Sequence, residues 1–156
     1  MTDAPVRPRH SNHQTQWAAQ FAVASELCKQ GYEVALTLGN HPSVDLMAIS
    51  PGLRRLHFDI DVKGLHTKNW WTVFPKQLVD NLYYIFAFVP KGSPNQFFIL
   101  TQEEVNSAIS DASSAARRRA EAKGLVSKFD KFPGVSWTAA AAHENAWHKL
   151  PGWVLE

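Results

Sequence analysis

The chain has a single cysteine, Cys28, among its 156 residues. One cysteine excludes an internal disulfide and a zinc cluster built from several cysteines. Long apolar runs are also lacking, because the longest, Leu82 to Val89, is too short to cross a bilayer. The polar stretch from Met1 to His13 has no apolar segment typical of a secretory signal. We therefore expect a cytoplasmic protein with no membrane segment.

An excess of charge of one sign is lacking as well. Lys and Arg number 16 against 14 Asp and Glu, which gives a net charge of +2. This balance excludes a general polycation, so any basic surface for nucleic acid must be local. The sequence offers one basic run, Arg117-Arg118-Arg119 with Lys123, inside a predicted helix. A solvated helix end and a nucleic-acid contact both explain that run, and both stay open.

Apolar residues recur with helical and strand periods along most of the chain. We expect helices over residues 14–29, 75–81 and 101–123, a helical segment within 138–149, and strands over 33–38, 44–49, 55–63, 82–89 and 96–100. This order favours an α/β fold with a mixed five-stranded sheet and helices on both faces. Its predicted parts are a disordered N-terminal lead (1–13), one core domain (14–125) and a Trp-rich C-terminal extension packed on the core (126–156).

Two helices carry patterns that predict their orientation or their start. In the first, Trp17, Phe21, Ala24 and Cys28 recur at helical spacing, and we expect this stripe to face the core. The long helix follows Thr101-Gln102-Glu103-Glu104, a capping pattern with an acid at the third helical position.

The strand over residues 55–63 alternates strictly. Phe58, Ile60 and Val62 point to one face, and His57, Asp59, Asp61 and Lys63 point to the other. A carboxylate and an ammonium thus lie two residues apart on one face, and a second acid, Asp45, begins the preceding apolar run. Asp45, Asp61 and Lys63 on one sheet can hold a divalent cation and stabilise charge on a phosphate. Asp59 shares the face and is either a substitute ligand or a neighbouring polar residue, and we favour the second interpretation.

The strand residues just described, together with those before them, resemble a known protein superfamily. The first helix, then Gly31-Tyr32-Glu33-Val34, Gly39 to Leu46 and Asp61-Val62-Lys63, together resemble the PD-(D/E)xK nuclease superfamily of restriction endonucleases and Holliday-junction resolvases. The resemblance covers residues 14–110 and implies a restriction-endonuclease-like fold. It assigns Asp45 and Asp61 to a catalytic Mg²⁺ or Mn²⁺, and Lys63 to the attacking water or the transition state.

The first helix departs from the superfamily pattern. Resolvase-like members carry a glutamate there that joins the metal site, and the matching position in this chain is Gln20. An amide still accepts a hydrogen bond but binds metal more weakly than a carboxylate. The nearby acid, Glu26, is expected to face solvent, opposite the apolar stripe.

The predicted function is that of a metal-dependent nuclease, a hydrolase that cleaves phosphodiester bonds in DNA, with Asp45, Asp61, Lys63 and Gln20 as site residues. A homodimer is compatible with it. The alternative is a nucleic-acid-binding or assembly module of the same fold with weak or lost cleavage, for which Gln20 is the reason. A third hypothesis is a small structural or interaction protein without a nucleic-acid role.

Overall fold

The computed structural model describes residues 11–42 and 44–153. Its elements are α1 (Asn12–Lys29), β1 (Glu33–Leu36), β2 (Leu46–Ile49), β3 (His57–Leu65), β4 (Trp71–Thr72), β5 (Leu82–Phe88), β6 (Gln96–Thr101), α2 (Gln102–Glu121), β7 (Gly134–Val135) and α3 (Trp137–Ala141), with short 3₁₀ helices η1 (Phe129–Lys131) and η2 (Trp147–Lys149). The main sheet has the order β1-β2-β3-β5-β6, with β3 and β5 parallel and the other neighbours antiparallel. The prediction of an α/β protein with a mixed five-stranded sheet flanked by helices is confirmed. Strands β4 and β7 pair separately.

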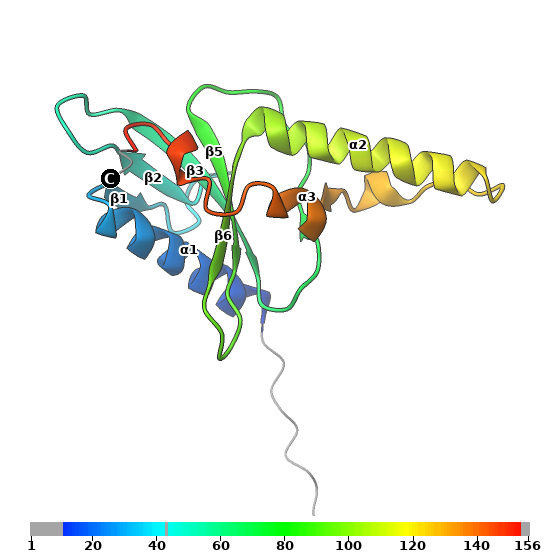
Figure 1. Ribbon diagram of the computed structural model, residues 1–156, viewed down its shortest axis with the longest axis horizontal. Coiled ribbons are helices and arrows are strands. Elements are labelled where there is room, and N and C mark those ends of the chain that lie inside the picture. The colour runs from blue at the N-terminus through cyan, green and yellow to red at the C-terminus, as the bar shows by residue number, and fades with distance from the viewer. Residues whose placement is uncertain (1–10, 43, 154–156) are drawn as a thin grey trace, which may run out of the picture.

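The sheet separates two apolar cores, and Figure 1 shows α1 on one side of it and α2 on the other. Helix α1 packs on one face, where Phe58, Ile60 and Val62 of β3 are buried as the alternation predicts. The other core holds Tyr84 and Phe86 of β5 together with the first half of α2, α3 and the small sheet. Among the described residues, no helix is long and apolar enough to span a membrane.

The C-terminal segment wraps around the outer edge of β6. Backbone hydrogen bonds join residues 143 and 145 to Ile99 and Phe97, so the edge strand does not stay open. This pairing divides the helix expected within 138–149 into α3 and η2. Beyond the edge, Trp153 stacks on Tyr32, whose hydroxyl donates to the Pro151 carbonyl at 2.9 Å.

Helix α1 begins at Asn12, capped by Ser11, so residues 12 and 13 belong to the helix rather than to the predicted lead. Residues 1–10 lie outside the described part of the chain. The expected apolar stripe is wrong: Trp17 and Phe21 are exposed and stack on each other, and Cys28 is exposed. The buried face is one of smaller residues, Ala19, Gln20, Val23 and Leu27.

The close approach of α1 to β3 explains why the helix buries its face of smaller residues. A Cβ at Gly64 would lie 2.8 Å from the Ala19 Cβ and 3.0 Å from the Thr15 carbonyl oxygen. Only a glycine opposite an alanine lets helix and strand come this close. If Trp17 and Phe21 faced the sheet instead, their bulk would hold α1 away from β3, and Gln16 and Gln20 of the helix would point away from the sheet.

The segment that crosses from β4 to β5 is not the predicted helix over 75–81. Its backbone is irregular, and α2 holds it instead. Gln102 donates to the Gln77 carbonyl at 2.8 Å and accepts from the Val79 amide at 2.9 Å, and Asn106 donates to the Lys76 carbonyl at 2.9 Å. These two side-chain amides satisfy backbone groups that a helix would have satisfied by itself.

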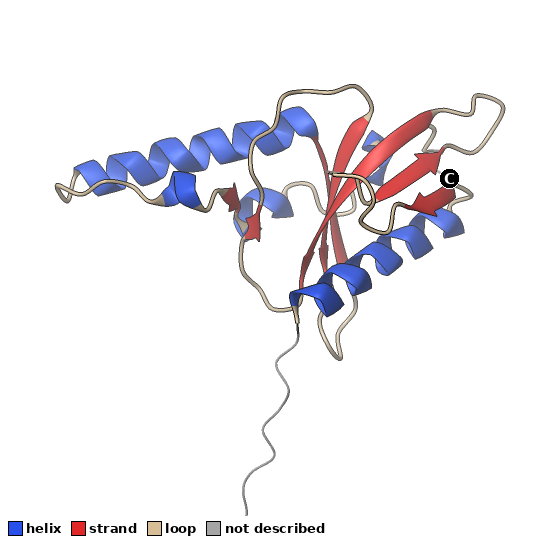
Figure 2. Ribbon diagram, turned by 180° about the vertical axis from the view of Figure 1, so that it is seen from behind, coloured by secondary structure: helices blue, strands red, loops and turns tan. Residues whose placement is uncertain are grey.

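Helix α2 starts with the predicted capping box, in which Thr101 and Glu104 exchange hydrogen bonds. Its first half is anchored by buried Val105 and Ile109, while its second half projects beyond the sheet, with residues 125–132 returning beside it (Figure 2). We call residues 111–132 the arm.

Candidate active site

Asp45 lies beside β3, immediately before the start of β2. Its backbone amide donates to the Ile60 carbonyl at 3.0 Å, and its Oδ2 accepts from the Val62 amide at 2.8 Å. Asp45 therefore bridges the two residues that flank Asp61. Its other oxygen, Oδ1, accepts from Gln20 Nε2 at 2.9 Å.

The environment of Asp45 opposes its charge. Burial raises the pKa of Asp45, and the nearby charge of Asp61 adds to that effect. The hydrogen bond from Val62 and the charges of Lys63 and Lys76 act in the other direction but do not cancel it. Burial is thus the main reason why the carboxyl of Asp45 resists ionisation, and Asp61 is one of the charged groups that act on it.

Two glutamines of α1 reach this edge of β3 from successive turns. Gln20 is 8% exposed and holds Asp45, and Gln16 Nε2 donates to the Val62 carbonyl at 2.7 Å. Pairing of β3 with β2 ends at Ile60, so Val62 has no strand partner on this side. Its amide and its carbonyl are instead bound by side chains, those of Asp45 and Gln16.

Asp61 is the most deeply buried charged group of the site, with 1% of its surface exposed. Lys63 Nζ lies 2.7 Å from Oδ1 as a charge contact, and Lys76 Nζ lies 2.8 Å from Oδ2 in a hydrogen-bonded ion pair. Both lysine side chains keep nearly a third of their surface in solvent. Each oxygen of Asp61 therefore faces one ammonium.

Tyr84 is the neighbour of Asp61 on β5. The two residues are paired in register, so their side chains share a face, and Lys76 Nζ lies 5.8 Å from the Tyr84 ring centroid. Burial, and then the charge of Asp61, raise the pKa of Tyr84 to about 12. Its hydroxyl is buried without a hydrogen-bond partner among the described residues. A buried water molecule could satisfy this O–H group.

The donor set fits a hard divalent cation in kind. Mg²⁺ is typically bound by one or two carboxylates, with waters and phosphate oxygens completing its shell. Asp45 and Asp61 supply two carboxylates, the Val62 carbonyl is adjacent, and the unpaired Tyr84 hydroxyl could bind a water of the shell. In the described part of the chain, no group of three or more His, Cys, Asp or Glu side chains could hold a metal ion. Any cation would therefore depend on water or substrate oxygens.

The structure thus brings together the four residues predicted as the site: Asp45, Asp61, Lys63 and Gln20. Glu26 lies elsewhere, in an ion pair with Lys29 at 2.8 Å. Asp59, the substitute ligand, lines a separate pocket with His57 and Asp80.

Sequence reasoning missed Gln16, Lys76 and Tyr84. The spacing of Gln16, one turn before Gln20, is a signal that could have found it. Lys76 carries no such signal, because its position depends on the way α2 holds the crossing segment.

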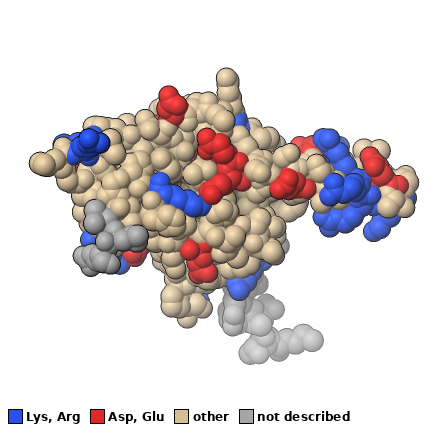
Figure 3. Space-filling model, turned by 45° about the horizontal axis from the view of Figure 1, so that its top comes forward, with Lys and Arg blue, Asp and Glu red and all other residues tan. Residues whose placement is uncertain are grey.

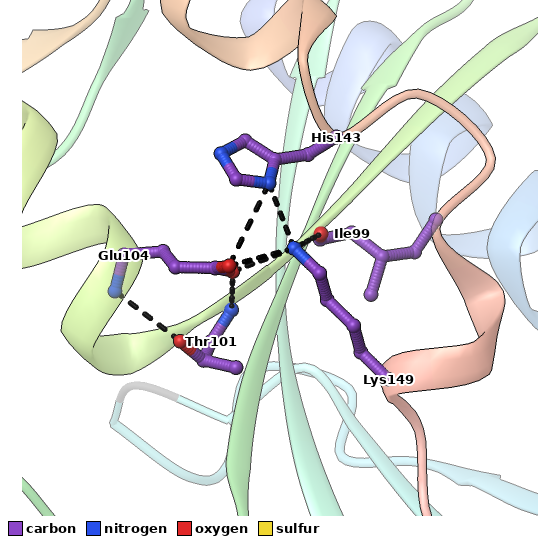
Figure 4. A network of polar contacts seen from close by, with 5 residues as sticks. All are labelled: Ile99, Thr101, Glu104, His143 and Lys149. Atoms are coloured by element: carbon purple, nitrogen blue, oxygen red, sulfur yellow. Dashed lines mark hydrogen bonds and ion pairs between the residues drawn. The ribbon is translucent and has the colours of Figure 1, made fainter.

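A second polar cluster ties the C-terminal segment to the start of α2 (Figure 4). Lys149 Nζ lies 2.7 Å from Glu104 Oε2, 2.7 Å from His143 Nδ1 and 3.1 Å from the Ile99 carbonyl oxygen. Burial works against the charge of Glu104, but hydrogen bonds from Lys149 and the Thr101 amide outweigh it, and the pKa of Glu104 is lowered. Burial, and then Lys149, lower the pKa of His143. We interpret this cluster as a structural clasp.

Positive charge is concentrated on the arm. The arm contains six Lys or Arg and three Asp or Glu, a net charge of +3 against +2 for the whole chain. Figure 3 shows these basic side chains gathered on the projecting end. Arg117 pairs with Asp130 at 2.8 Å, and a groove lined by Leu125, Val126 and Phe129 runs beside them.

Comparison with known proteins gives no match: the chain matches no protein-family model, no curated protein and no solved structure. Its function therefore has to be inferred from the chemistry of these residues.

Proposed function

We propose that this chain is a divalent-metal-dependent nuclease that hydrolyses phosphodiester bonds in DNA, on a restriction-endonuclease-like fold of the PD-(D/E)xK type. One observation carries the proposal. Gln20, Asp45, Asp61 and Lys63 come from a helix and two strand regions, yet they converge at one edge of β3. Two carboxylates with a lysine, one acid just before β2 and the other acid and the lysine within β3, support this chemistry.

The contacts support a role for each residue in this proposal. Mg²⁺ or Mn²⁺ bound by Asp45 and Asp61 would supply an activated water and would screen the phosphate charge. Lys63 is partly exposed and lies against Asp61, where it can orient the attacking water or neutralise developing charge. Gln20 and Gln16 hold Asp45 and the Val62 carbonyl in place, and the buried Tyr84 hydroxyl can donate to an internal water beside Asp61.

The arm is the part of the surface suited to a nucleic-acid backbone. Its exposed arginines and lysines give it a net charge of +3, more than the +2 of the whole chain, and phosphate contacts supply most sequence-independent affinity for DNA. We assign the arm to duplex binding and the β3 edge to chemistry.

A cleavage assay tests the proposal. Supercoiled plasmid, a four-way junction and single-stranded DNA are incubated with the protein in Mg²⁺ or Mn²⁺, with EDTA as the matched control. Cleavage that requires metal and is lost in Asp61→Asn and in Asp45→Asn supports the nuclease. Equal cutting by Asp61→Asn and the unmodified chain would show that a contaminant or another site is responsible.

A specific observation favours the second candidate, a nucleic-acid-binding or assembly module with weak or lost cleavage. Both oxygens of Asp61 already face ammonium groups, and Gln20 supplies an amide where a third acid would bind metal. Salt-dependent DNA binding with no metal-dependent cutting on any substrate would select this function.

A further inference from the structure

Lys76 is delivered to the site by the crossing segment between β4 and β5. Asn106 binds its backbone carbonyl at 2.9 Å, and Gln102 binds Gln77 and Val79 just beyond it. Its ammonium reaches Asp61 Oδ2 at 2.8 Å, above the Tyr84 ring. This lysine is anchored at both ends, unlike a solvated surface lysine.

The charges of the site balance. Asp45 and Asp61 carry two negative charges, and Lys63 and Lys76 carry two positive charges next to them. A divalent cation at Asp61 would face two ammoniums at close range, and its binding to this neutral site would be weak. One of the two lysine contacts must therefore give way before Asp61 can take up a cation.

Lys76 is the contact that can give way. Lys63 lies on β3 two residues from Asp61, so the strand keeps the two side chains next to each other on one face. Lys76 comes from an irregular segment 15 residues away, so only its flexible, partly exposed side chain keeps its ammonium at Asp61. Its side chain can swing away while Asn106 keeps its backbone in place.

We propose that Lys76 is an internal counter-cation, which occupies Asp61 in the metal-free protein and moves to a phosphodiester oxygen when cation and DNA bind together. This inference rests on the proposed function and adds a regulation to it. DNA supplies the negative charge that takes Lys76 away from Asp61, so cation and DNA bind cooperatively. By linkage, each ligand raises the affinity for the other by the same factor.

The first test is calorimetric titration of Mn²⁺ without DNA into four proteins: unmodified, Lys76→Met, Lys76→Arg and Asp45→Asn. Lys76→Met keeps the length of the side chain and removes its charge, and we expect Mn²⁺ to bind at least about tenfold tighter. Lys76→Arg keeps the charge and should bind like the unmodified chain. Asp45→Asn should lose most binding, and thermal unfolding of each protein confirms that it is folded.

The second test measures DNA affinity with Ca²⁺, another oxygen-binding cation, and with EDTA. Ca²⁺ should tighten DNA binding more in the unmodified chain than in Lys76→Met. Equal or weaker Mn²⁺ binding by Lys76→Met, or equal Ca²⁺ effects on DNA binding, would overturn the role of Lys76 while the metal site stands. If Asp45→Asn binds Mn²⁺ as well as the other proteins do, the metal site itself is wrong, and this inference fails with it.

Discussion

Replacing Gln20 with glutamate puts a second carboxylate against Asp45. In the unmodified chain, Gln20 is almost fully buried and its Nε2 donates to Asp45 Oδ1 at 2.9 Å. Glutamate cannot donate when ionised, so this hydrogen bond becomes a contact between like charges. We expect Gln20→Glu to destabilise the metal-free protein and to tighten metal binding.

The size of both effects can be worked out. A hydrogen bond to a charged group contributes about 1.5–3 kcal/mol, and we take about 2 because Asp45 keeps a second bond from Val62. For a domain of this size, that loss lowers Tm by about 4–8 °C. With saturating Mn²⁺, a tenfold tighter Kd adds about 1.4 kcal/mol. Mn²⁺ should therefore raise the Tm of the variant by about 3–6 °C more than that of the unmodified chain.

Thermal unfolding in EDTA and in Mn²⁺ measures both effects on one sample. Gln20→Met is the matched control: it loses the same hydrogen bond without adding charge, so its Tm should fall without a metal-dependent gain. Glu26→Gln should change neither value, because Glu26 pairs only with Lys29 in the described structure. The reasoning is refuted if Gln20→Glu unfolds like Gln20→Met in Mn²⁺, or if Glu26→Gln abolishes the effect of Mn²⁺.

Four further predictions concern single contacts. Lys63→Ala should lower the cleavage rate about a hundredfold, about 3 kcal/mol, with Mn²⁺ binding in calorimetry kept or tightened, because an ammonium beside Asp61 is lost; an unchanged rate would make this lysine a surface charge. Tyr84→Phe removes a buried unpaired hydroxyl and should raise the free energy of unfolding in urea by about 1 kcal/mol, whereas a loss would mean that the hydroxyl has a partner. Burial and Lys149 lower the pKa of His143, so below about pH 6.5 this histidine is protonated more in the unfolded chain than in the folded one. The free energy of unfolding should therefore fall as the pH drops from about 7 to 5.5. In His143→Gln, the urea midpoint should depend less on pH over this range. Replacing Arg118 and Arg119 together with glutamine should weaken DNA binding and lower the slope of log affinity against log salt by about 2, and an unchanged slope would remove the arm from the interface.

The strands that carry the site could be predicted because their signal is local. Strict alternation in β3 sets Phe58, Ile60 and Val62 against Asp61 and Lys63, and the structure buries the apolar set as expected. The buried face of α1 could not be predicted in the same way, because the helix has two stripes at helical spacing. The closeness of Ala19 to Gly64 decides between them, and that contact joins residues far apart in the sequence.

The crossing segment was mispredicted for a related reason. Residues 75–81 contain a proline suited to a first helical turn, and their local preference favours a helix. Gln102 and Asn106 of α2 bind the backbone of this segment in another conformation, and their contribution cannot be read from the segment itself. Lys76 reaches Asp61 only as a result of this long-range restraint.

The two carboxylates of the site differ in what holds them, and this difference supports a functional role. Asp61 is buried between two ammoniums, so its charge is compensated within the protein. Asp45 is held by an amide side chain and a backbone N–H, and burial followed by repulsion from Asp61 raises its pKa. Because that pKa is raised on folding, the charged form of Asp45 reduces stability at neutral pH. Asparagine could keep the bond from Val62 without that loss, so stability alone would favour an amide at this position. A carboxylate that lowers the stability of its protein is typical of a group whose charge has a function. A bound cation is the partner that would stabilise the charge of Asp45.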